Sequence, residues 1–236
     1  MALPKLNVPK YKLKLPSDGR TVTYRPFLVK EEKLLLLATE TGEQDEIIGA
    51  IKNIIAECTD ITSVDKLATF DIEYLFLQIR TKSVGENVDV TVTCPDDGET
   101  EVEVSIPLDE IKVVKTRGHK KELKLDDEIA VTMGYPNLAS FVESNFGEDT
   151  NQIDQIFEMA ATCIETIADA NQIYECKDVP KSEILEFLDQ LSSKQFAELQ
   201  KFFETMPKLS HKIQVTNPNT GVESEVVLEG LASFFA

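Results

Sequence analysis

Apolar and polar residues alternate in three separate parts of the chain, over residues 11–24, 86–114 and 211–228. Alternation with a period of two places successive side chains on opposite faces of a β-strand. Each alternating segment is interrupted by a short run that contains proline and glycine, which favour tight turns. The pattern therefore predicts a β-hairpin at the amino end, in the middle and at the carboxyl end. A weaker alternation over 122–132 indicates a further pair of strands.

Between the first two hairpins, apolar residues recur with the spacing of α-helices. Residues 29–39 are rich in helix formers, and residues 47–55 place isoleucines along one side of a helix. Phe70, Tyr74 and Leu77 follow at intervals of four and three residues. Three helices are predicted in this part of the chain.

The segment 136–206 is predicted to be helical as well. Its first apolar stripe is formed by residues at helical spacing, namely Ile153, Ile156, Phe157, Ala160, Ile164 and Ile167. Farther along, Ser182 is a candidate N-cap. Ser192 and Gln195 match a capping box, in which two side chains satisfy backbone N–H groups at the start of a helix.

These elements predict an α+β fold in which three β-hairpins surround a helical core. The chain divides into an extended arm, an amino-terminal hairpin with helices, a β region, a helical region and a carboxyl-terminal hairpin with an apolar tail: 1–10, 11–85, 86–134, 135–207 and 208–236. If the middle and last hairpins lie side by side, residues 86–114 and 209–230 form one small β unit. The helices of 136–206 are then an insertion between them.

Composition excludes several classes of protein. The chain has 236 residues and 42% hydrophobic residues, enough for a buried core. Its 24 basic and 42 acidic residues leave a net charge of −18, which argues against binding to nucleic acid or to an anionic membrane surface. Neither a signal peptide nor a membrane-spanning run is expected, because the apolar runs are short.

Charge is also distributed unevenly along the sequence. Residues 1–33 hold eight basic and three acidic residues, whereas residues 126–175 hold eleven acidic residues and no Lys, Arg or His. This segregation fits either a solvated helical face beside a basic segment, or complementary surfaces that dock in an assembly. The sequence pattern leaves both interpretations open.

No catalytic or cofactor-binding motif is recognised. The four cysteines form no C-x-x-C pair, which fits free thiols in a reducing compartment. The two histidines, His119 and His211, have no nucleophile motif beside them and are interpreted as structural or surface residues. We therefore expect a non-enzymatic protein with no cofactor and no small-molecule substrate. A hydrolase of cell-wall material is the enzymatic alternative, although no acid and nucleophile can be named for it.

One internal repeat is present, with the pattern V-T-x-P-x-x-G at 92–98 and again at 215–221. The same pattern surrounds the zinc knuckle C-P-x-C-G, in which two thiolates grip one metal ion. The four ligand positions are occupied here by Cys94, Asp97, Asn217 and Thr220, so zinc binding is not expected. Two interpretations remain: a degenerate zinc-ribbon-like pair held by packing, or a turn sequence that both hairpins happen to share.

Several strings resemble a known family. LPKLNVPKY at 3–11, LPS at 15–17, YRPFLVKEEK at 24–33 and DIEYLFLQIRTKSVGE at 71–86 are similar to the baseplate hub proteins of T-even-type contractile-tailed phages. The last string leads into the first knuckle, where family members carry C-P-x-C-G. The lost cysteines depart from that pattern.

The resemblance implies a structural protein of the virion tail baseplate, assembled in the host cytoplasm. It would act in tail assembly through contacts with other phage baseplate or hub proteins. A hub subunit and a chaperone that is absent from the mature virion both fit the resemblance. It carries over no catalytic residues.

Two segments are candidate docking sites for such partners. The arm offers Leu3, Leu6, Val8 and Tyr11, and an arm that becomes ordered on binding can wrap a partner. The tail offers Leu231, Phe234 and Phe235. The alternatives are a disordered terminus for the arm and closure of the core for the tail.

Overall fold

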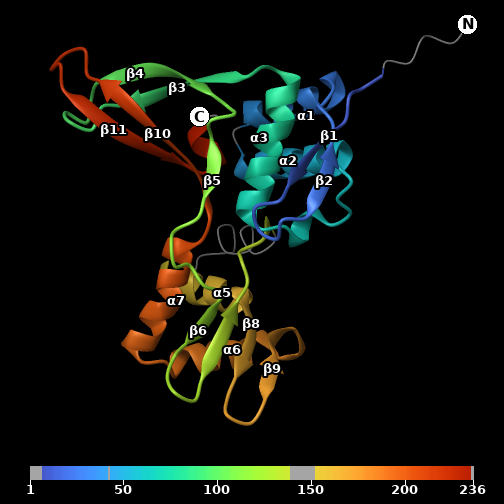
Figure 1. Cartoon of the computed structure of the whole chain (residues 1–236), viewed down its shortest axis with the longest axis vertical. Coiled ribbons are helices and arrows are strands. Elements are labelled where there is room, and N and C mark those ends of the chain that lie inside the picture. Colours follow the sequence, from blue (N-terminus) through green and yellow to red (C-terminus); the bar gives the residue numbers. More distant parts are fainter. Residues whose placement is uncertain (1–6, 42, 139–151, 235–236) are drawn as a thin grey trace, which may run out of the picture. The chain divides into compact units, whose positions relative to one another are not determined.

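The structure is a computed structural model that describes residues 7–41, 43–138 and 152–234. The chain forms two compact units. The first combines 1–64, 70–114 and 207–236, and the second combines 65–69 and 115–206. Each unit is described by itself (Figure 1).

The first unit contains three hairpin-forming strand pairs and three helices (Figure 1). Its amino-terminal half has the elements β1 (Tyr11–Lys14), β2 (Thr21–Tyr24), α1 (Val29–Thr41), α2 (Gln44–Cys58) and α3 (Thr69–Ser83). The short helix η1 (Val64–Lys66) before α3 lies at the boundary with the second unit. The remaining elements are β3 (Asn87–Thr93), β4 (Glu101–Pro107), β5 (Lys112–Val114), β10 (Lys208–Thr216), β11 (Glu223–Glu229) and η3 (Leu231–Phe234).

The hairpins β3–β4 and β10–β11 share one hydrophobic core. Every second residue of β3 is buried, as the alternation predicts, and these side chains meet Ile213 and Val215 of β10 and Leu228 of β11. Both hairpins are antiparallel, and β5 extends the second one by pairing with β10. The segments 86–114 and 209–230 thus form two separate sheets that pack on one core.

The second unit is built on an antiparallel sheet in the order β6-β7-β8-β9. The strands are β6 (Glu122–Lys124), β7 (Ala130–Met133), β8 (Ile164–Ala168) and β9 (Ile173–Glu175), and the helices are α5 (Gln152–Cys163), η2 (Cys176–Asp178), α6 (Lys181–Asp189) and α7 (Ser193–Thr205). The core joins the sheet to the helices through Val131, Met133, Ala160, Leu199 and Phe202. The inserted segment is thus a mixed α and β unit rather than a set of helices alone.

The predicted α+β class, the three hairpins, the three early helices and the strand pair at 122–132 are confirmed. The helical stripe through Ile164 and Ile167 is wrong, because helix α5 ends at Cys163 and both isoleucines lie in β8. Pairing with β7 on one side and β9 on the other overrides the helical spacing. The Asp169 carboxylate supports the turn after β8 by accepting the N–H groups of Asn171 and Gln172.

Helix starts in the second unit agree with the sequence at one site and differ at another. Ser192 and Gln195 form the predicted capping box at the start of α7. Ser182 is not an N-cap, because α6 begins at Lys181 and Pro180 occupies the cap position. The carbonyl of Pro180 accepts the N–H groups of Glu183 and Ile184. The fixed φ of proline makes it suitable for this entry into the helix.

Candidate interaction sites

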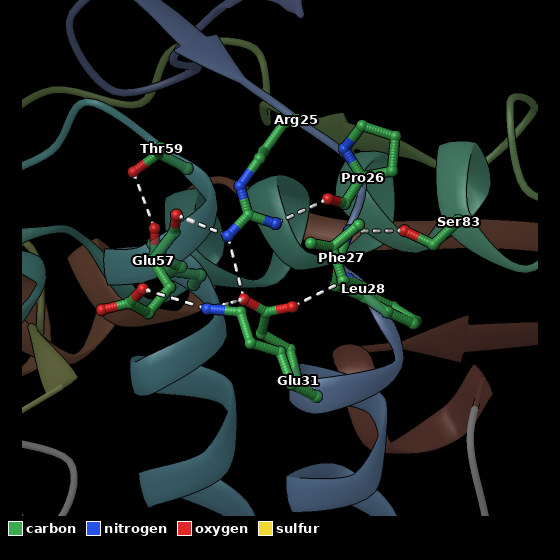
Figure 2. Close-up of polar contacts among 10 residues, drawn as sticks. Arg25, Pro26, Phe27, Leu28, Glu31, Glu57, Thr59 and Ser83 are labelled. Atoms are coloured by element: carbon green, nitrogen blue, oxygen red, sulfur yellow. Dashed lines mark hydrogen bonds and ion pairs between the residues drawn. The ribbon is translucent and has the colours of Figure 1, made fainter. Parts of the chain in front are cut away.

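The string YRPFLVKEEK at 24–33 folds into a polar junction that connects β2 with the helices of the first unit (Figure 2). The guanidinium of Arg25 lies at its centre. It donates to the carbonyl of Pro26 at 2.9 Å, to the Glu31 carboxylate at 2.9 Å and to the carbonyl of Glu57 at 3.0 Å. Arginine has five N–H donors in a fixed planar fork, whereas lysine has three donors on a single nitrogen.

Glu31 is almost completely buried, yet both oxygens of its carboxylate have hydrogen-bond or ion-pair partners. Oε1 accepts from Arg25 and lies 3.1 Å from the Lys30 ammonium, while Oε2 accepts the Leu28 N–H at 2.8 Å. The last bond caps α1, because the carboxylate at the third helical position reaches back to the residue before the helix. Burial opposes ionisation, but the hydrogen bonds from Arg25, Leu28 and Lys30 outweigh it and lower the pKa of Glu31 to about 2.

Backbone contacts extend this junction to α2 and α3. The Arg25 N–H donates to the carbonyl of Cys58 at the end of α2. The Phe27 N–H donates to Ser83 Oγ at 2.9 Å, and Ser83 in turn donates to the carbonyl of Ile79 within α3. The string therefore fixes the start of α1 against the ends of two other helices. It holds the fold together and contains no nucleophile–base pair.

Helix α1 exposes an apolar surface that the sequence analysis missed. We define the α1 surface as Leu28, Val29, Leu34, Leu36 and Leu37. Val29 is 78% exposed, Leu36 59% and Leu37 49%. The run of four leucines at 34–37 contained the signal, since successive helical residues are 100° apart and cannot all face one core. Five large apolar side chains exposed between residues 28 and 37 make this segment a candidate interaction surface.

The candidate docking residues of the arm and tail lie in different environments. Val8 and Tyr11 are partly buried, and the Tyr11 ring lies 5.6 Å from that of Tyr24, with the Lys82 ammonium 5.8 Å from its centre. Phe234 is fully buried in the core of the first unit, which is the arrangement expected for core closure. Leu231 begins η3. Leu3, Leu6 and Phe235 lie outside the described residues.

The turns of β3–β4 and β10–β11 meet, and hydrogen bonds from Asn217 and Thr220 to Asp96 and Asp97 join them. The Asn217 amide donates to Asp97 Oδ2 at 2.8 Å and to the Asp96 carboxylate at 3.0 Å. Thr220 Oγ1 donates to Asp96 at 2.6 Å. Cys94 is buried, and burial together with the neighbouring Asp96 and Asp97 raises the pKa of its thiol.

Comparison with known proteins decides the family. A family model described as T4 bacteriophage base plate protein matches residues 8–236. The chain belongs to this family. It is therefore a bacteriophage baseplate protein, and the match extends the resemblance of the amino-terminal strings over both units. No curated protein and no solved structure matches the chain significantly.

Both histidines of this baseplate protein have structural surroundings. His119 lies 3.0 Å from Thr205 Oγ1 and 3.2 Å from the Tyr135 hydroxyl, and its ring lies against Phe202. Burial and the nearby cations Lys115 and Lys121 lower the pKa of His119, which favours the neutral ring. His211 lies 3.9 Å from the Glu110 carboxylate.

A surface groove of about 550 Å³ in the second unit of the baseplate protein is lined by residues of α5, β8, η2 and α6. Its two lysines are already engaged, since Lys181 lies 2.6 Å from Glu158 and Lys177 lies 3.7 Å from Glu175. Within the described ranges, no three His, Cys, Asp or Glu residues are placed to hold a metal ion. No described helix is long and apolar enough to cross a membrane.

Proposed function

We propose that this baseplate protein is a subunit of the central hub of a contractile tail and acts through contacts with other baseplate proteins. The observation that carries the proposal is the α1 surface, where large apolar side chains of α1 and of Leu28 just before it are exposed. Burying one such leucine or valine against a partner is worth about 1.5–3 kcal/mol. Removal of these side chains from water therefore provides a driving force for assembly.

The polar junction at Arg25 supports this role because it holds α1 in place before a partner binds. Glu31 and the carbonyl of Leu28 cap the start of the helix, and α1 packs along α2. A preorganised surface loses less conformational entropy on binding than a flexible one. The arm at 3–11 is a second proposed contact, which would extend from the same hairpin that carries Tyr11.

An assembly chaperone for hub components is the second candidate function. The net charge of −18 favours it, because an acidic protein can cover a basic partner surface until assembly. The two candidates differ in one respect that can be measured directly. A subunit stays in the finished tail, whereas a chaperone leaves it.

The α1 surface can be tested in infected cells by replacing Leu36 and Leu37 together with glutamine. Glutamine preserves helix propensity, so the variant should fold while losing apolar contact area. We expect the amount of the protein in purified tails to fall at least tenfold, with a matching loss of infectious particles. Tenfold corresponds to about 1.4 kcal/mol of lost contact energy, which two leucines readily exceed.

The matched control is Val227→Thr, which removes an exposed apolar side chain from β11 in the same unit. Threonine retains the β preference of valine, so the strand should be kept. This variant should enter tails normally. Normal incorporation of the Leu36→Gln/Leu37→Gln protein would show that the α1 surface is not the contact.

A further inference from the structure

The P-x-x-G turn occurs three times in the first unit, once more than the repeat in the sequence indicated. The copies begin at Leu15, Cys94 and Asn217. In each copy the glycine N–H donates to the carbonyl of the first residue, at 2.9, 2.9 and 2.8 Å respectively. The first residue is buried each time, although its chemistry changes from leucine to thiol to amide. The turn itself therefore requires no particular side chain at this position.

Only two of the three turns face each other. The turns at Cys94 and Asn217 are joined by the bonds from Asn217 and Thr220 to Asp96 and Asp97. A further bond connects Asn219 to Thr100 Oγ1 at 3.0 Å. The turn at Leu15 meets helix α3 instead, where Ser17 donates to the Asp71 carboxylate. A shared turn sequence alone does not account for the paired arrangement.

We propose that the two facing turns are a zinc-knuckle pair that folds without metal, in which the Asn217 amide bridges the turns at the place where an ion would. An amide nitrogen has two hydrogens and no lone pair for a metal, so it serves as a donor between two carboxylates. One hydrogen points to Asp97 and the other is shared by the two oxygens of Asp96. The side-chain oxygen of Asn217, Oδ1, also has partners, since it accepts the backbone N–H groups of Asn219 and Thr220.

The residues present do not fit a zinc ion. Structural zinc sites use four thiolate or imidazole ligands, and Cys94 is the single cysteine among the four positions. Asp96 and Asp97 bring two carboxylates together, and these accept hydrogen bonds from Thr220, Asn217 and Thr100. Hydrogen bonds to charged groups thus perform the cross-linking that thiolates and zinc perform in a metal knuckle.

This inference predicts that the metal site can be restored by three substitutions. Asp97→Cys, Asn217→Cys and Thr220→Cys would join Cys94 in a four-cysteine set. The purified triple variant should bind one Co²⁺ per chain with the intense visible absorption of tetrahedral cobalt thiolate. Its melting temperature should rise with Zn²⁺ and fall when a chelator is added, because metal binding to the native state adds to stability.

A matched control places the same chemistry in the unpaired turn. The Leu15→Cys/Asp18→Cys protein also has two cysteines in a P-x-x-G turn, but no second turn faces them. It should bind Co²⁺ at least tenfold more weakly than the triple variant. The wild-type protein should carry no stoichiometric zinc, and its melting temperature should not respond to a chelator.

A folded triple variant that binds no tetrahedral Co²⁺ would overturn the proposal, as would chelator-sensitive melting of the wild-type protein. Should the triple variant fail to fold, a double-mutant cycle with Asp97→Ala and Asn217→Ala decides the question. If the bridge exists, the double variant should lower the folding equilibrium constant by a factor that differs more than about twofold from the product of the two single-variant factors. Additive effects would show that the two turns do not support each other.

Discussion

At the scale of single residues, the polar junction of Arg25 and Glu31 shows what the sequence can reveal and what it cannot. The string at 24–33 is distinctive enough to indicate the family, but its residues give no sign that Arg25 reaches the carbonyl of Glu57. That partner is 32 positions away, and only the packed helices bring it close. The hydrogen bonds from the Asn217 amide cannot be predicted from the local sequence either, because their acceptors lie in a different hairpin.

Glu31→Gln tests the strength of this junction. The substitution removes the charge that Arg25 and Lys30 face, and leaves the buried side chain with mismatched donors. We expect a loss of about 1.5–3 kcal/mol in the free energy of unfolding, the range for a hydrogen bond to a charged group. Chemical denaturation measures this loss, with Glu40→Gln, an exposed position on the same helix, as the control. A loss below 0.5 kcal/mol, on the order of a neutral surface substitution, would contradict the assignment.

The same residue predicts a pH dependence. The pKa of Glu31 is about 2 in the folded protein and 4.5 for the unperturbed side chain, so the folded state holds the carboxylate ionised. Its contribution is complete above pH 4.5 and is lost as the pH falls toward 2. The stability difference between wild type and Glu31→Gln should therefore be constant from pH 5 to 7 and shrink below about pH 4. A difference that grows in acid would contradict the ion pair.

At the scale of elements, local patterns predicted most strands and helices, because the alternation and the helical spacing each match the side that is buried. The segment 164–175 is an exception, because it was predicted to be helical and forms the strands β8 and β9. Ile164 and Ile167 continue the helical spacing of α5, yet they pair with β7 in the sheet. The exposure of α1 is the opposite case, since the helix was predicted and its apolar surface was not. The strand conformation of β8 and the exposure of α1 both depend on which other elements pack against them. The sequence of the segment alone does not contain that information.

Two glycines provide a test of the turn geometry at this scale. Gly221 has φ of 76° in the turn of β10–β11, whereas Gly49 lies within helix α2. A Cβ added at either position would meet no atom within 4 Å, so backbone conformation alone sets the effect. Gly221→Ala should destabilise the protein by about 1–2 kcal/mol, and Gly49→Ala should stabilise it by up to about 1 kcal/mol. Thermal unfolding of the two variants measures whether each substitution lowers or raises stability. Equal changes in stability would refute the turn assignment.

At the scale of the whole molecule, the two units differ in the features that they contain. The first contains the two facing P-x-x-G turns, the polar junction and the α1 surface, and the second encloses its own core of sheet and helices. The family model spans both units, so membership of the family rests on the two units together and not on one of them. Composition argues against nucleic-acid and membrane partners, whereas the surface that we propose for a protein partner depends on side-chain exposure, which the sequence does not contain.

The proposed role as a hub subunit is tested most directly by quantitative mass spectrometry of purified mature phage particles, with the infected-cell lysate measured alongside. A subunit that docks through the α1 surface should be present at a fixed copy number per tail. That number should be the same in independent preparations and should remain after washing in high salt, since apolar contacts are not screened. A protein that is abundant in the lysate and absent from the particle would contradict a permanent place in the hub, and would assign the chain to the chaperone role.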